Sequence, residues 1–120
     1  MVTSNDTFST ALSVLLNTAK PTHLNSNIVP YMPLIEFVIS TAFGGTDVNT
    51  LKSKFHDLIA IDANLDLLES RADFAIRRCF TKSGGFISNR GCCLEEANSW
   101  LWHKNACIII RKCREMINFV

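Results

Sequence analysis

Apolar side chains recur at helical spacing along most of the chain. In the first such segment, Phe8, Leu12 and Leu15 fall on one side, with polar residues between them. A repeat of about 3.6 residues is typical of helices that bury one face. The same pattern marks five segments: 4–20, 28–43, 46–59, 62–80 and 94–118. We therefore predict an all-α fold, a single compact domain of about five helices over residues 1–120.

Proline and glycine residues indicate where some of these segments begin and end. Pro30 and Pro33 suit the start of the second helix, and Gly44-Gly45 would end it. Asp62 would open the fourth helix. Residues 81–91, TKSGGFISNRG, are rich in Gly, Ser and Asn and predict a loop or a tight hairpin.

The last segment separates its apolar and charged residues on a helical wheel. The apolar side gathers Trp102, Ala106, Ile109, Ile110, Cys113, Met116 and Ile117. The opposite side carries Lys104, Arg111, Arg114 and Glu115, with Lys112 at its edge. Three consecutive isoleucines in ACIIIRKC would also suit a buried strand, but the separation favours a helix whose basic residues face outward.

The composition is that of a folded globular protein. Apolar residues make up 48% of the chain and charged residues 19%, far from the profile of a disordered chain. The longest apolar stretch, 28–43, is short for a membrane span and contains two prolines and Glu36, so we expect no membrane contact. Because no secretory signal is visible, we expect an intracellular protein, cytoplasmic or nuclear.

Five cysteines are an odd number and do not resemble a small secreted disulfide framework. Free thiols or metal ligands are the alternatives. His103 and Cys107 lie one helical turn apart and could form half of a zinc site, with Cys93 or Cys79 completing it. No CxxC pair is present, and buried cysteines also act as small apolar residues. Two alternatives therefore stay open: these residues bind zinc, or the protein has no cofactor.

No motif in the chain identifies a reaction. The glycine pairs do not form a phosphate-binding loop, and no arrangement of carboxylates indicates a general acid and base. A nucleophilic cysteine beside His103 would need a third, orienting group that the sequence does not identify. We therefore expect a nonenzymatic protein.

The net charge of +1 hides two oppositely charged parts. Up to Ile76 there are eight acidic and four basic residues, a net −4; from Arg77 onward there are eight basic and three acidic residues, a net +5. A basic surface with an exposed tryptophan is typical of nucleic-acid binding, RNA in preference to DNA here. The candidate binding residues are Arg77, Arg78, Lys82, Arg90, Trp100, Lys104, Arg111, Lys112 and Arg114.

Two other partners suit the same features. A basic helix also suits an acidic protein partner. Trp100, Leu101 and Ile108 lie outside the main apolar side of the last helix, which would suit a homo-oligomer or a self-assembling accessory subunit. The general character of the chain is similar to that of small viral accessory proteins, and this resemblance assigns no role to any residue.

Overall fold

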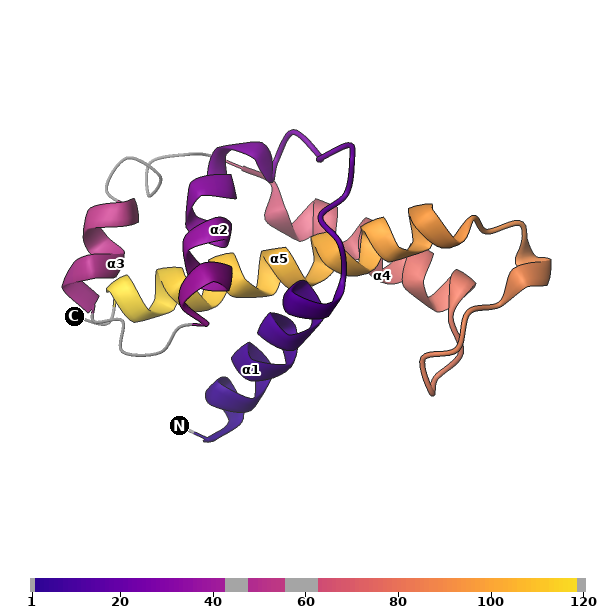
Figure 1. The fold of residues 1–120 in the computed structure, drawn as a ribbon, viewed down its shortest axis with the longest axis horizontal. Coiled ribbons are helices and arrows are strands. Elements are labelled where there is room, and N and C mark those ends of the chain that lie inside the picture. The colour runs from indigo at the N-terminus through magenta and orange to yellow at the C-terminus, as the bar shows by residue number, and fades with distance from the viewer. Residues whose placement is uncertain (1, 43–47, 56–62, 119–120) are drawn as a thin grey trace.

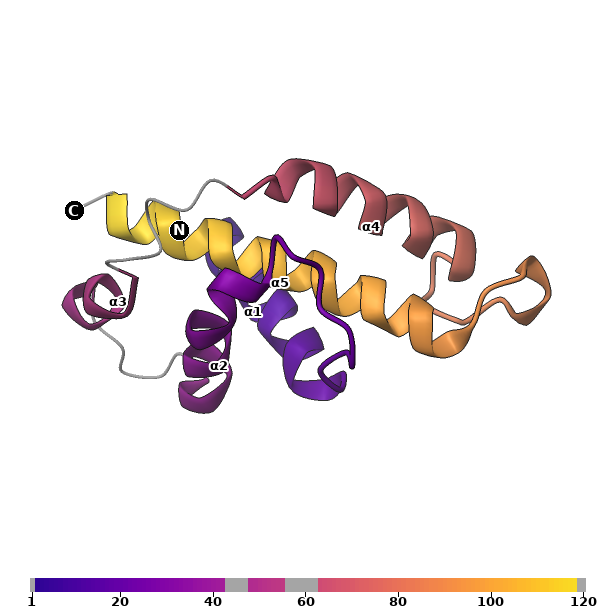
Figure 2. The ribbon, with the colours of Figure 1, turned by 90° about the horizontal axis from the view of Figure 1, so that it is seen from above.

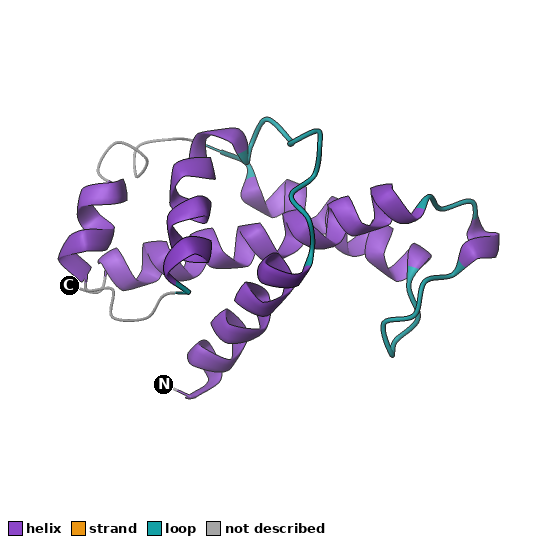
Figure 3. Cartoon of the chain, viewed as in Figure 1, coloured by secondary structure: helices purple, strands orange, loops and turns teal. Residues whose placement is uncertain are grey.

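The computed structural model describes residues 2–42, 48–55 and 63–118. Over this part of the chain it contains five α-helices and two short 3-10 turns (Figure 1). The elements are α1 (Val2–Asn17), the 3-10 turn Val29–Tyr31, α2 (Met32–Thr41), α3 (Val48–Phe55), α4 (Leu65–Cys79), the 3-10 turn Ser88–Arg90 and α5 (Leu94–Asn118). The predicted all-α class is confirmed, and Figure 3 shows helices joined by loops.

Helix α5 is the axis around which the other helices pack. Helices α1, α2 and α3 lie along one side of it, and α4 runs along another, as the view in Figure 2 shows. The result is an elongated molecule of 47 × 29 × 22 Å. Because α5 is covered from more than one direction, it needs apolar side chains on more than one side.

The hydrophobic core follows the apolar side predicted for α5. Trp102, Ile109 and Cys113 are fully buried, and they belong to one cluster with Tyr31 and Ile35 from the α2 region. Trp100 and Ile108, which sequence reasoning assigned to a surface for self-assembly, also pack against this cluster. Contacts within the chain therefore account for those two apolar residues.

The start of α2 differs from the predicted helix 28–43. Pro30 lies in the 3-10 turn, and the α-helix begins only at Met32, with Pro33 in its first turn, where a missing N–H costs nothing. Ala42 ends the helix in the left-handed conformation, with φ of 47°. The predicted stop at Gly44-Gly45 lies outside the described residues.

Helix α4 runs antiparallel to α5 and begins at a side-chain cap. Asn64 Oδ1 accepts a hydrogen bond from the N–H of Leu67 at 3.0 Å, which satisfies one free donor of the first turn. The buried face of α4 is formed by Leu65, Leu68, Ala72 and Cys79. The predicted start at Asp62 and the predicted third-helix residues 46–47 and 56–59 lie outside the described residues.

Candidate functional site

The eight candidate basic residues divide into two sets. The first set, which we call the seam set, lies on α5 and consists of Lys104, Arg111, Lys112 and Arg114. The second, the loop-end set, lies at the end of α4 and in the loop that follows: Arg77, Arg78, Lys82 and Arg90. All four seam residues are partly buried, whereas all four loop-end residues are exposed.

Acidic residues of α4 hold two members of the seam set. Lys104 Nζ lies 2.5 Å from a carboxylate oxygen of Asp73. The guanidinium of Arg111 spans 2.7 Å to Glu69 and 2.5 Å to Asp66. Burial tends to lower the pKa of Arg111, but the hydrogen bond and charge of Glu69, with the charge of Asp66, raise that pKa overall.

The other two seam residues also have partners within the chain. Arg114 donates a hydrogen bond to the hydroxyl of Tyr31, and its guanidinium carbon lies 5.3 Å from the centre of the Tyr31 ring. Lys112 Nζ lies 3.5 Å from Glu115, one turn away. The prediction that the charged side of α5 faces outward is therefore wrong for Lys104, Arg111 and Arg114, because neighbouring elements cover that side as well.

The loop-end set surrounds a short hairpin that closes the α4–α5 pair: Arg77 and Arg78 precede it on α4, Lys82 lies in it and Arg90 follows it. Phe80 and Phe86 form an isolated β-bridge, and their rings meet edge to face with centroids 5.9 Å apart. The N–H of Thr81 donates to the carbonyl of Gly85 at 2.7 Å, and Gly84 between them has φ of 95°. This confirms the predicted loop or hairpin at 81–91.

The stretch of sequence that carries the loop-end residues contains no acidic residue. Between Asp73 and Glu95 the chain carries four basic residues and no acidic one. Arg78 donates to the backbone carbonyl of Arg90 at 3.3 Å. Within the described ranges, no ion pair involves any of the four, so their charge is directed to solvent.

A disulfide between Cys79 and Cys92 holds the base of this loop, with the two Cα atoms 5.8 Å apart. The expectation that the cysteines are free thiols is wrong for this pair. Because α4 and α5 are antiparallel, Cys79 at the end of α4 lies next to Cys92, which precedes the start of α5. Since disulfides are found mainly in oxidising compartments, this bond does not favour the intracellular location that we expected from the lack of a visible secretory signal.

The four predicted zinc ligands do not converge. Cys79 is in the disulfide, Cys107 is fully buried, and Cys93 is exposed at the start of α5. Over residues 2–42, 48–55 and 63–118, no group of three or more histidine, cysteine or acidic residues could hold a metal ion. The zinc prediction is therefore wrong for this set of residues.

His103 is a structural histidine that joins α5 to the loop after α1. Its Nε2 accepts a hydrogen bond from the N–H of Asn25 at 3.0 Å, and its Nδ1 lies 2.7 Å from the carbonyl of Ser99. This pairing fits the neutral ring that donates from Nδ1. Burial lowers the pKa of His103, although the hydrogen bond to Ser99 opposes the shift. Both ring nitrogens are therefore occupied, and neither is free for a metal.

The buried thiols of α5 are also unsuited to nucleophilic chemistry. Burial raises the pKa of Cys107 to about 12, and the nearby charge of Glu69 adds to the shift. Burial raises the pKa of Cys113 to about 12 as well. Because the thiolate is the nucleophile, neither side chain is activated near neutral pH.

Trp100 lies between the seam set and the loop-end set. It is partly buried, and the guanidinium carbon of Arg71 lies 5.6 Å from the centre of its ring. The predicted stacking residue is therefore already covered in part by its own chain. Arg71 was not among the predicted site residues, since it belongs to the acidic half of the sequence.

Phe74 is the residue near this site that sequence reasoning missed. It is 67% exposed, although it is a large aromatic side chain in the middle of a regular helix. Two hollows of about 370 and 110 Å³ lie beside it, and Trp100 lines both. The sequence contained one indication that Phe74 is exposed: it falls on the polar side of α4, outside the apolar stripe.

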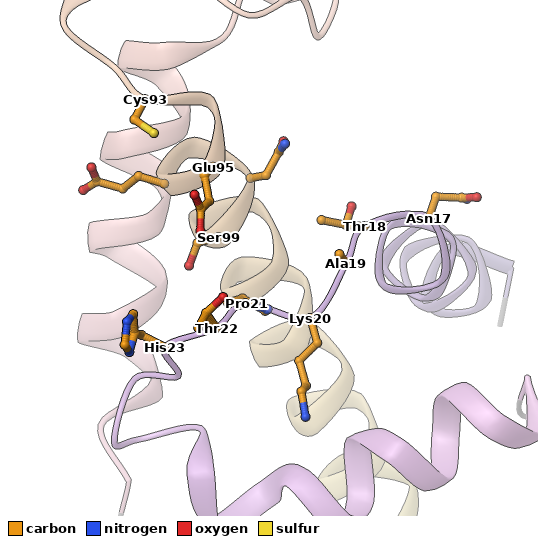
Figure 4. A pocket seen from close by; sticks show the side chains of 12 residues that line it. Asn17, Thr18, Ala19, Lys20, Pro21, Thr22, His23, Cys93, Glu95 and Ser99 are labelled. Carbon is orange, nitrogen blue, oxygen red and sulfur yellow. The ribbon is translucent and has the colours of Figure 1, made fainter.

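A larger cavity of about 660 Å³ lies between the end of α1 and the start of α5 (Figure 4). Its lining combines Lys20 and His23 from the loop after α1 with Glu95 and Glu96 from α5. This mixed lining favours no single class of charged ligand.

Comparison with known proteins returns no match to a family model, to a curated protein sequence or to a solved structure. None of the helices in the described part of the chain combines the length and the hydropathy needed to cross a bilayer.

Proposed function

We propose that the protein is a nonenzymatic binding protein that engages nucleic acid, RNA in preference to DNA, through its loop end. The observation that carries the proposal is the contrast between the two basic sets. Lys104 and Arg111 are neutralised by α4, whereas Lys82 and Arg90 are exposed on a stretch of chain without acidic residues. Binding of a phosphate backbone to such a surface is favourable because it releases the counterions bound to the nucleic acid.

The loop that carries Lys82 and Arg90 is anchored at its base. The Cys79–Cys92 disulfide fixes the base of the loop, and the hydrogen bond from Arg78 to the carbonyl of Arg90 joins helix and loop. An anchored loop loses less conformational entropy on binding than a free one. Glu95 and Glu96 at the start of α5 oppose an anion, so we expect moderate affinity with strong salt dependence.

The experiment compares two lysines at opposite ends of the molecule. Lys82 lies in the loop beyond α4, and Lys52 lies on α3 at the other end (Figure 1). Lys82→Glu and Lys52→Glu change the net charge equally, so they separate a local site from general attraction. Fluorescence anisotropy with labelled RNA over a salt series gives affinity and salt slope.

We expect Lys82→Glu to weaken RNA binding about tenfold at low salt and to reduce the salt slope by about one. Lys52→Glu should stay within about twofold of the unmodified protein, because only long-range attraction changes. Equal losses in the two variants, or no binding at low salt, would contradict the proposal.

An acidic protein partner is the second candidate. The observation that favours it is the pair of exposed apolar residues on α4, Leu67 and Phe74, which are 55% and 67% exposed. An apolar strip with arginines beside it also suits an acidic peptide that carries apolar anchors. Such a partner would contact both apolar residues, and this provides a test to separate it from nucleic acid.

A further inference from the structure

One face of α4 combines exposed apolar and basic side chains in a single line. Leu67, Arg71, Phe74 and Arg78 follow one another at spacings of four, three and four residues, and all four are exposed. Such spacing places side chains on the same side of a helix. The buried residues of α4 lie on another side of the helix, against α5, and the four residues of this line are accessible to solvent at the border with α5.

Phe74 occupies the middle of this line, with an arginine on either side. Arg71 and Arg78 are seven residues apart, which corresponds to about 10 Å along the helix axis. A strand that runs along α4 could therefore meet a cation, an aromatic ring and a second cation in turn. Arg71 is also the residue that lies over Trp100, so it links the exposed ring to the half-buried one.

The surface beside Phe74 is hollowed, which leaves room for a flat group. The larger hollow, of about 370 Å³, is lined by Ser70, Arg71, Phe74, Ala75 and Trp100. The smaller one lies on the side of Arg78 and the disulfide. Phe74 lies outside the residues that pack against the hydrophobic core, so its ring is available to a ligand.

We propose that Phe74 is a stacking platform for unpaired bases, with Arg71 and Arg78 holding the phosphates on either side, so that the ligand is single-stranded nucleic acid. This inference rests on the proposed function and specifies its ligand. Aromatic rings and arginine planes bind unpaired bases without regard to sequence. In a duplex both faces of each base are already stacked, so Phe74 would gain no partner there.

One nearby charge acts against this ligand. Glu96 lines the smaller hollow together with Phe74 and Arg78. Its carboxylate repels phosphate, so we expect Glu96→Gln to strengthen binding of a single strand by about threefold.

The test uses Leu67 as a matched control for Phe74, because both are exposed apolar residues on the same face of α4. The probe is a labelled RNA of about twelve nucleotides, within the site size usual for single-strand binders, measured alone and annealed to its complement. We expect Phe74→Ala to weaken binding of the single strand about tenfold, and Phe74→Trp and Leu67→Ala to remain within about twofold. The unmodified protein should bind the duplex at least about tenfold more weakly than the single strand.

The outcomes separate this inference from the proposal on which it rests. If Lys82→Glu weakens binding while Phe74→Ala does not, the stacking inference fails and the proposed function stands. If single strand and duplex bind equally well, the inference also fails. Equal losses in Phe74→Ala and Leu67→Ala would indicate apolar docking instead, and the absence of any RNA binding overturns both. Since Phe74 and Leu67 are exposed, far-UV circular dichroism and a thermal melt should show that Phe74→Ala, Phe74→Trp and Leu67→Ala are folded.

Discussion

The two basic sets of this protein have the same formal charge and different roles in the structure. The seam set on α5 lies where helices meet, and its charges are used within the chain: Lys104 with Asp73, and Arg111 with Glu69. The loop-end set lies at the end of α4 and in the disulfide-closed loop that follows, and it faces solvent. A basic half of a sequence is therefore not always a basic surface, because opposite charges that face each other across a helix pair leave little electrostatic field outside.

The largest effect on stability is expected from reversing a charge at the seam. Arg111→Glu would place a carboxylate against Glu69 and Asp66, and we expect the free energy of unfolding to fall by about 2 to 3 kcal/mol. Urea denaturation followed by circular dichroism measures it. Adding Glu69→Arg should restore part of the loss. A change below about 0.5 kcal/mol would show that these contacts do not hold α4 to α5.

The disulfide is expected to have the next largest effect. Replacing Cys79 and Cys92 together by serine should lower the free energy of unfolding by about 2 kcal/mol, because the open chain regains conformational freedom when it unfolds. Cys93→Ser is the control, since that thiol is exposed and free. If both variants unfold at the same urea concentration as the unmodified protein, the disulfide does not constrain the loop end.

A smaller effect should appear when the pH is lowered. Because burial lowers the pKa of His103 in the folded protein, the unfolded state takes up the proton first as the pH falls. Stability should therefore decrease below the ordinary histidine pKa of about 6.5, by no more than about 1.4 kcal/mol per pH unit. The protonated ring could not accept the hydrogen bond from Asn25. His103→Gln should flatten this part of the stability profile between pH 7 and pH 5.5, and an unchanged profile would contradict the assignment.

The smallest effect on stability is expected at the loop end. Arg90→Glu should change the free energy of unfolding by less than about 0.5 kcal/mol, since the side chain is exposed and only its backbone carbonyl receives a hydrogen bond. The same variant should weaken RNA binding about tenfold. A loss of stability as large as that of Arg111→Glu would remove the distinction between the two sets.

The helices could be predicted well because they depend on local spacing. The bounds 94–118 were read from the period of Trp102, Ile109 and Cys113, and α5 has those bounds. The prediction was less accurate at the start of α2, which a 3-10 turn precedes. In a continuous α-helix from residue 28, Pro33 would fall in the interior, where its missing N–H costs a hydrogen bond.

The candidate site could be predicted only in part, because it depends on contacts between helices. Nothing local shows that Lys104 meets Asp73 or that Cys79 meets Cys92, since both pairs require the antiparallel register of α4 and α5. A helical wheel of α5 alone assigns an outer side, and α4 then covers part of it. Phe74 was overlooked because it lies outside the apolar stripe of α4, and its exposed ring becomes part of a site only where α5 brings Trp100 beside it.

The difference between the seam set and the loop-end set is tested by two double variants in one RNA-binding assay. Lys104→Gln with Asp73→Asn removes a paired charge and its partner, whereas Lys82→Gln with Arg90→Gln removes two exposed charges. We expect the first variant to bind RNA within about twofold of the unmodified protein and the second to lose at least about tenfold in affinity. Equal losses, or a larger loss in the first variant, would contradict this difference.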